Sequence, residues 1–102
     1  KEFNIVLQEA NKSNVEQGLE ILEAGPNPTH GKYLIKVSSG RLEELNLECF
    51  DVSGKSIHQF KSVSIHGLTN VEIDQQVLSH PGVYFLVMRT AQSKKILKIV
   101  VQ

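Results

Sequence analysis

The sequence lacks the features that mark several large classes of protein. Only one of its 102 residues is cysteine, so no internal disulfide can form, and that residue says little about the compartment. Eleven basic and eleven acidic side chains give a formal charge of zero, which argues against a nucleic-acid binder with its basic surplus. No run approaches the roughly 20 apolar residues of a membrane helix, and no segment resembles a signal peptide. What remains is an ordinary globular domain.

The length indicates one domain that is large enough to bury a single core. A hydrophobic content of 40% is typical of such a domain, and no low-complexity tract indicates disorder. The chain starts at Lys1 and not at methionine, so we expect it to be an excised part of a longer precursor.

The end of the chain predicts a β-hairpin. Two apolar runs, residues 82–90 and 94–102, flank a short polar break. Both faces of the first run are apolar, with Val83, Phe85 and Val87 on one face and Tyr84, Leu86 and Met88 on the other. Such a strand needs cover on both sides, so we expect it to be central in its sheet or to meet a partner there.

The rest of the chain also predicts strands, at residues 3–8, 19–24, 33–37, 45–49, 56–61 and 68–74, with 63–65 as an extension or a separate short strand. A helix competes for residues 13–24, because Ser13 and Glu16 have capping-box spacing. We prefer a strand there, since Gly18 and Gly25-Pro26 leave little room for a helix. A turn is expected at 38–41, a break at His66-Gly67 before residues 68–74, and a loop or one helical turn at 75–82. Residues 19–102 thus contain seven or eight short strands, which favour an all-β fold, an antiparallel sandwich of two sheets.

Two turn motifs punctuate these strands. Pro26-Asn27-Pro28 has two prolines that fix φ and remove backbone donors, and Gly31 can end the corner with a positive φ. Asp51 and Gly54 have the spacing of a tight hairpin, in which the carboxylate accepts backbone N–H bonds and the glycine takes the left-handed position.

Three elements in this order resemble a known family. They are Pro26-Asn27-Pro28-Thr29-x-Gly31, then Leu47-x-x-Phe50-Asp51-x-x-Gly54-Lys55, and finally Pro81-Gly82-Val83-Tyr84-Phe85 followed by Lys94-Lys95-x-x-x-Ile99-Val100-Val101. The pattern is similar to the type A C-terminal sorting domain of the type IX secretion system of Bacteroidetes, carried by gingipain-like surface proteins. It covers roughly residues 20–102. Gly25 and Cys49 depart from it, since both stand where the family usually has a larger apolar residue.

The resemblance implies an immunoglobulin-like antiparallel β-sandwich of about seven strands that acts as an export signal. Family members cross the periplasm, are directed through the outer-membrane translocon, and usually lose the domain to a sortase-like protease at the surface. The implied partners are therefore this machinery and a covalently attached passenger. Residues 19–102 would be the sorting domain, and residues 1–18 an extra strand or a linker.

The resemblance carries over the following sorting-motif residues: Pro26, Asn27, Pro28, Gly31, Asp51, Gly54, Pro81, Gly82, Tyr84, Lys94, Lys95, Ile99, Val100 and Val101. Several have a plainer interpretation. The Asp51–Gly54 pair is most often only a hairpin. Lys94, Lys95 and Lys98 are either a docking patch or lysines that protect an exposed sheet edge.

No catalytic, metal or cofactor site is predicted. The four histidines lack the close spacing of a metal site. Cys49 lies on an apolar face, which favours a buried inert thiol. No nucleophile elbow and no phosphate-binding glycine loop occurs. We therefore expect a non-enzymatic module.

Two other functions stay open at this point. One is an immunoglobulin- or fibronectin-like adhesion or carbohydrate-binding accessory module, and the other is a domain of a secretion-machinery component. Homodimerisation is also expected to be accessible, because a bare sheet edge favours self-association.

Overall fold

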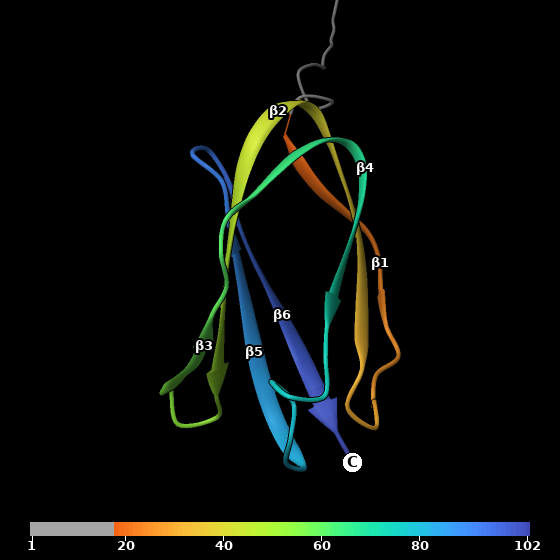
Figure 1. Cartoon of the computed structure of the whole chain (residues 1–102), viewed down its shortest axis with the longest axis vertical. Helices are drawn as coiled ribbons and strands as arrows, with labels where there is room; N and C mark the ends of the chain where they lie inside the picture. The colour runs from red at the N-terminus through yellow and green to blue at the C-terminus, as the bar shows by residue number, and fades with distance from the viewer. Residues whose placement is uncertain (1–17) are drawn as a thin grey trace, which may run out of the picture.

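The computed structural model describes residues 18–102, which form six β-strands and no helix (Figure 1). The strands are β1 (Leu19–Gly25), β2 (Tyr33–Asp51), β3 (Ser56–Gln59), β4 (Val63–Ile73), β5 (Gly82–Arg89) and β6 (Lys94–Val101). The strand expected at residues 3–8 lies outside the described part of the chain. No helix in residues 18–102 is long and apolar enough to span a bilayer.

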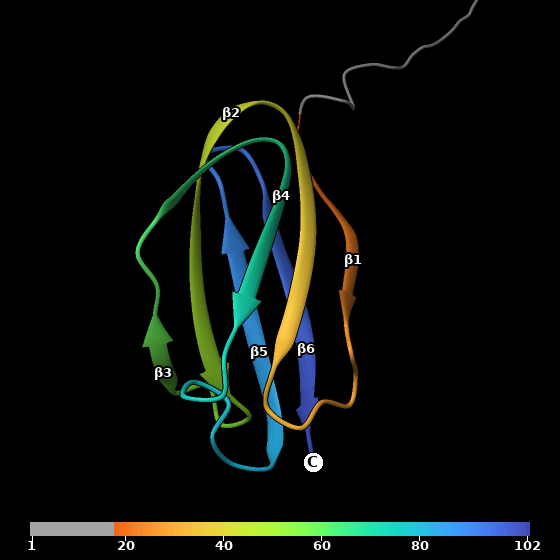
Figure 2. The same cartoon turned by 45° about the vertical axis from the view of Figure 1, so that its right-hand side comes forward.

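All six strands pair antiparallel in one curled sheet. The first half of β2 pairs with β1 and β4, and its second half pairs with β3 and β5. β6 completes the second half by pairing with β5. Figures 1 and 2 show the two halves on opposite sides of the interior, joined through the bend of β2. The arrangement is consistent with the predicted immunoglobulin-like sandwich.

The turn predicted at residues 38–41 is wrong, because β2 runs through this segment without reversing. Its pairing register with β4 shifts between Ser39 and Glu43, where the strand crosses from one half of the sheet to the other. The buried Ser39 hydroxyl lies 2.6 Å from Glu43 Oε2 and 2.8 Å from the Arg41 carbonyl oxygen. These local bonds replace ladder bonds at the bend. The Ser-Ser-Gly-Arg sequence therefore bends the strand and does not end it.

The break predicted after His66-Gly67 is also wrong, since β4 continues from Val63 to Ile73. These two mergers explain why the described residues form fewer strands than the seven or eight predicted. The strand preferred over a helix at residues 19–24 is confirmed by β1.

The core is made by alternate residues of the strands. On β5 the buried side chains are Tyr84, Leu86 and Met88, and the two inward residues near the end of β6 are Ile99 and Val101. β2 contributes to both halves, with the buried residues Tyr33, Ile35, Val37, Leu45, Leu47 and Cys49. Such alternation is the period of a strand with one face in the core. β5 lies between β2 and β6, so its predicted central position is confirmed.

Candidate recognition surface

The predicted motifs meet at one end of the molecule, which we call the motif end. It consists of the β1–β2 corner (residues 25–32), the β2–β3 turn (51–55), the β4–β5 loop (74–82) and the last residues of β6 (98–102). The pairing register places them together, because Asp51 opposes Tyr84, Gly82 opposes Val101, and Thr29 bridges to Val101. Figure 1 shows these segments at the bottom of the molecule, beside the C-terminus. Segments far apart in the sequence thus form one surface.

The β1–β2 corner clamps the outer edge of β6. Asn27 Nδ2 donates to the carbonyl oxygen of Lys98 at 2.8 Å, and Asn27 Oδ1 accepts from the N–H of Val100 at 2.8 Å. The amide side chain therefore takes the place of a backbone peptide group in a neighbouring strand. Prolines flank Asn27, and both peptide bonds that precede them are cis.

Thr29 continues this pairing through its backbone. Its N–H donates to the carbonyl oxygen of Val100 at 2.8 Å, and its carbonyl oxygen accepts from the N–H of Gln102 at 2.8 Å. Its buried hydroxyl accepts from the N–H groups of Gly31 and Lys32 and donates to the Lys32 carbonyl oxygen. The corner is therefore held both to β6 and to itself.

Gly31 ends the corner in the conformation that the sequence predicted, with φ of 127°. A Cβ at this position would also lie 3.1 Å from Cγ of Gln75, in the β4–β5 loop. Beside it is a shallow depression of about 330 Å³, to which Pro26 and Leu34 contribute. The depression is open and apolar, which suits contact with a partner side chain more than chemistry.

The β2–β3 turn has the predicted aspartate at its first position. Asp51 Oδ1 accepts from the Ser53 hydroxyl at 2.6 Å, from the Ser53 N–H at 2.9 Å and from the Lys55 N–H at 3.0 Å. The Ser53 hydroxyl is the main cause that lowers the pKa of Asp51, and the Lys55 N–H is the next. Gly54 has φ of 91°, as the left-handed position of the turn requires. The structure confirms the hairpin interpretation of this motif.

Tyr84 ties the β4–β5 loop to the core. Its ring is buried, and its hydroxyl donates to the carbonyl oxygen of His80 at 2.6 Å. A tyrosine near the start of a strand that bonds to the backbone a few residues upstream is a feature of immunoglobulin-like sandwiches. Pro81 and Gly82 lie between the two bonded residues, and both are exposed.

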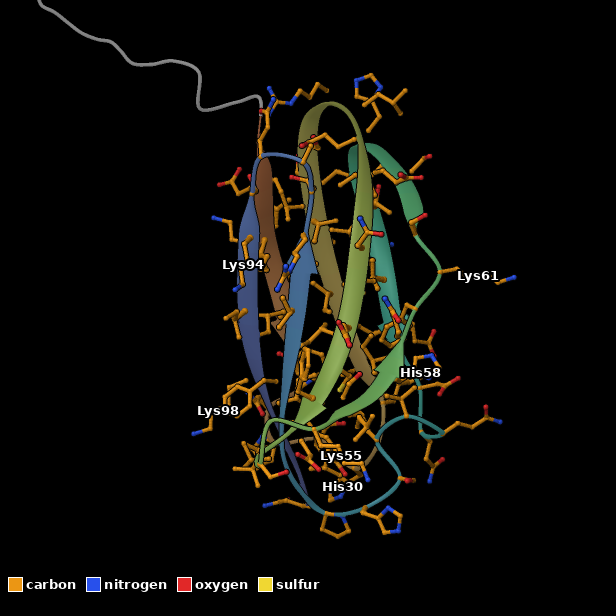
Figure 3. The ribbon with its side chains drawn as sticks, turned by 90° about the vertical axis from the view of Figure 1, so that its left-hand side faces the viewer. His30, Lys55, His58, Lys61, Lys94 and Lys98 are labelled. Atoms are coloured by element: carbon orange, nitrogen blue, oxygen red, sulfur yellow. The ribbon has the colours of Figure 1, made fainter. Side chains whose placement is uncertain are left out.

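Lys94 and Lys95 are not part of the motif end. Lys94 opposes Arg89, and β6 runs from there to Val101, which opposes Gly82 at the motif end. Lys94 and Val101 are seven positions apart along the strand, a distance on the order of 23 Å. Figure 3 shows Lys94 and Lys98 along the same edge of the molecule. The predicted site residues therefore form one cluster and one separate pair of lysines.

The edge of β6 is only partly covered by the described residues. Lys98, Val100 and Gln102 direct backbone groups to the corner residues Asn27 and Thr29. Backbone groups alternate between the two edges of a strand, so those of Lys94 and Ile96 point to the same side. On this outer edge, opposite to the one that pairs with β5, no described strand pairs with β6.

The burial predicted for Cys49 is confirmed. Cys49 is fully buried, and burial raises the pKa of its thiol to about 11. The ring of His58 packs edge to face on Phe60, with centroids 4.4 Å apart. Within residues 18–102, no group of three or more histidine, cysteine, aspartate or glutamate side chains is arranged to hold a metal ion.

Sequence reasoning missed the importance of Thr29. It was read only as a member of the Pro26–Gly31 motif, yet it is the most deeply buried polar residue of the corner. Its signal is the spacing to Gly31 and Lys32, which is that of a local hydroxyl-to-backbone turn. Its bridge to Val101 is not visible in the sequence, because the two residues are far apart along the chain.

Comparison with known proteins identifies the family. No curated protein and no solved structure matches the chain. The family model of the secretion system C-terminal sorting domain matches residues 24–102, a stretch that begins at the end of β1 and includes every element of the motif end. The chain therefore belongs to the family of secretion system C-terminal sorting domains, which are the sorting signals of type IX secretion.

Proposed function

We propose that this domain is a non-enzymatic signal that acts by its folded shape, and that the motif end and the hairpin of β5 and β6 are its working surface. The observation that carries the proposal is the clamp between Asn27, Thr29 and β6, because it joins the two most separated motifs of the family match. A family defined as a sorting signal needs a recognisable surface and no catalytic group.

The route follows from membership of the family. Type IX sorting leads through the outer membrane to the cell surface or to secretion. In the proposed sequence of events, the passenger and the domain reach the periplasm, the translocon recognises the domain, and a sortase-like protease removes it at the surface. Residues 19–102 would act in recognition, and residues 1–18 would connect the domain to its passenger or add a strand.

The sorting-motif residues divide into two proposed roles. Those of the motif end, such as Asn27, Asp51 and Tyr84, hold the corner, turn and loop in place by the hydrogen bonds described above. Ile99 and Val101 anchor β6 in the core, and Val100 receives the corner. Lys94 and Lys95 lie where β6 begins, so they would act in docking or in protection of the edge.

Main-chain pairing is one proposed mode of recognition, and the structure limits where it can occur. A partner strand could add to β6 only near Lys94–Lys98, because Asn27 and Thr29 cover the later part of this edge. Ile96→Pro tests this mode, since it removes a donor that points to the open edge. Leu97→Pro is the control that removes a donor facing β5 and should unfold the hairpin.

The charge of the two lysines is tested separately. Lys94→Gln with Lys95→Gln removes the charge of both side chains and keeps them polar. Reduced export with an unchanged melting temperature would support docking. Unchanged export of a soluble, folded domain contradicts docking, and aggregation of the variant would support edge protection.

The decisive experiment on the proposed function is a fusion. Residues 19–102 are placed behind a periplasmic reporter, in a bacterium with a type IX system and in a strain without its translocon. We expect the reporter at the cell surface only in the first strain. Reporter retained in the periplasm of both strains, with the domain folded, would contradict the proposal and favour an adhesion-type module.

A further inference from the structure

The outer face of the second half of the sheet carries an apolar surface that the core does not use. On β5 the residues that alternate with the buried ones are Val83, Phe85 and Val87. Because side chains alternate along a strand, these three point away from the core. Both faces of this strand are apolar, but the core covers only the face of Tyr84, Leu86 and Met88.

The pairing register arranges neighbouring side chains into rows across this face. Phe50 on β2 opposes Phe85, and Phe85 opposes Lys98 on β6. In the rows on either side, Val83 opposes Val100, and Val87 lies between Glu48 and Ile96. We call the apolar members of these rows the outer apolar face: Phe50, Val83, Phe85, Val87, Ile96 and Val100.

None of these six side chains is among those that pack on the core. Ile21, Phe60, Val71, Val77 and Leu97 are the partly buried apolar residues that do so. Ile96 is 56% exposed, and the other five residues of the outer apolar face are partly exposed. A contiguous apolar patch with a polar border is typical of an interaction site.

The border of the face is cationic. Arg89 and Lys94 form the row beyond Val87 and Ile96, and Lys98 lies beside Phe85. None of the three has a carboxylate partner within residues 18–102. Residues 75–102 contain no aspartate or glutamate, although the whole chain is neutral. Glu48 is the one acidic side chain in these rows, and it accepts a hydrogen bond from the Ser56 hydroxyl at 2.7 Å.

The opposite outer face, formed by β1, β2 and β4, shows a different arrangement. It also exposes leucines, including Leu68 on β4, which is 69% exposed. However, its charges pair with one another, as in Lys32–Glu72 at 3.4 Å and Lys36–Glu23 at 3.7 Å. The charges of that face pair with one another. On the outer apolar face, the cations have no carboxylate partner among the described residues.

We propose that the outer apolar face is the docking surface for a protein partner that presents an apolar strip flanked by carboxylates. This inference rests on the proposed function, because the partner would be a protein met during export. Apolar contact would supply affinity, and the carboxylates opposite Arg89, Lys94 and Lys98 would supply orientation and a fast encounter.

Charge argues against a second copy as the occupant, and the placement of the apolar side chains argues against a membrane. A second copy docked by the same face would bring the cations of one copy close to those of the other, and like charges that meet across an interface destabilise it. An anionic membrane would match the charge, but all six apolar side chains are on strands, and five of them are already partly buried. Stable membrane binding needs apolar groups buried about 5–10 Å deep.

The test uses substitutions that keep strand propensity, in the full chain fused to an exported reporter. Phe85→Thr removes apolar area from the face, and Lys94→Glu with Lys98→Glu reverses its border. The matched controls are Leu68→Thr on β4 of the opposite face and Lys61→Glu, which lies at the opposite edge of the molecule in Figure 3. Melting temperatures of the purified chains establish that each variant is folded.

We expect reporter at the cell surface to fall about tenfold or more for the two face variants, as for loss of an interface hot spot. The controls should stay within about twofold. Normal export of folded Phe85→Thr and of the folded double variant would overturn the inference. Absence of export for the unmodified chain would instead contradict the proposed function, so the two failures are distinguishable.

A photo-crosslinker identifies the class of occupant. Benzoylphenylalanine is placed at Phe85 or, as a control, at Leu68. We expect Phe85 to form an adduct with one protein of the secretion machinery, lost when Lys94 and Lys98 are both Glu. Sedimentation that shows a dimer broken by Phe85→Thr would overturn the inference in favour of a second copy. Lysine-dependent binding to phosphatidylethanolamine–phosphatidylglycerol vesicles would overturn it in favour of a lipid surface.

Discussion

The side chain of Asn27 makes two hydrogen bonds to the backbone of β6 that a neighbouring strand would otherwise make. Its amide presents one donor and one acceptor to β6 with the spacing of a peptide group, at 2.8 Å in both directions. The flanking prolines have no N–H, so neither offers a backbone donor that competes with the Asn27 amide for the carbonyl oxygen of Lys98.

We predict that Asn27→Ala lowers the free energy of unfolding by about 1–2 kcal/mol, since two hydrogen bonds are lost at an edge that water can reach. The N–H of Val100 should exchange with solvent faster in the variant. Urea unfolding and amide exchange measure the two effects. Unchanged exchange at Val100 would show that the side chain does not hold β6 in solution.

Asp51 makes the β2–β3 turn sensitive to acid. The hydrogen bonds from the Ser53 hydroxyl and from the Lys55 and Ser53 N–H groups hold its pKa below the usual 3.8 in the folded protein. Because the folded pKa is the lower one, the stabilisation is complete above pH 3.8 and is lost as the pH falls through the folded pKa.

We predict that an NMR titration of the Asp51 carboxyl carbon has its midpoint below 3.8. Asp51→Asn keeps an oxygen acceptor but cannot ionise, so this variant should lose the corresponding part of the acid dependence of stability. A midpoint at or above 3.8 would mean that the turn does not stabilise the carboxylate.

At the scale of elements, substitutions on the two faces of β5 are expected to have different effects on stability. Leu86 is fully buried in the core, and its neighbour Val87 belongs to the outer apolar face. We predict that Leu86→Ala lowers the free energy of unfolding by about 2–5 kcal/mol, because it leaves a cavity. Val87→Ala should cost less than about 1 kcal/mol, a loss mainly of strand propensity. Equal losses in urea unfolding would mean that both faces are covered in the free chain.

The strands were largely predictable from the alternation of apolar and polar residues. The two errors in that prediction have one cause. Ser38–Arg41 and His66-Gly67 have the local composition of turns, but both lie where paired strands bend together between the two halves of the sheet. Turn residues report local backbone freedom and do not distinguish a bend from a reversal. The hairpin at Asp51 was predicted correctly because all its bonds are local.

The recognition surface was only partly predictable for a related reason. The motif residues could be named from the resemblance, but their meeting at one end depends on pairings such as Thr29 with Val101. The separation of Lys94 and Lys95 from that end follows from the register of β5 and β6. Sequence spacing alone contains neither fact.

At the scale of the whole molecule, the described strands form one connected sheet with a single core, and residues 1–18 are outside the family match. We predict that a chain of residues 19–102 unfolds in one transition, with a free energy within about 0.5 kcal/mol of that of the full chain. A loss of several kcal/mol would assign residues 1–18 to the folded domain and contradict the proposed boundary.

The clamp at the motif end has a mechanical consequence. β1 begins at the end opposite to the one where β6 finishes, so a force applied between Leu19 and Val101 runs along the strands. The hydrogen bonds of antiparallel strands lie across this direction, so they are loaded in shear and must break together. The bonds from Asn27 and Thr29 add to the load that β6 can bear. The folded domain should therefore resist a force applied between its two ends more strongly than a force that breaks these hydrogen bonds one at a time.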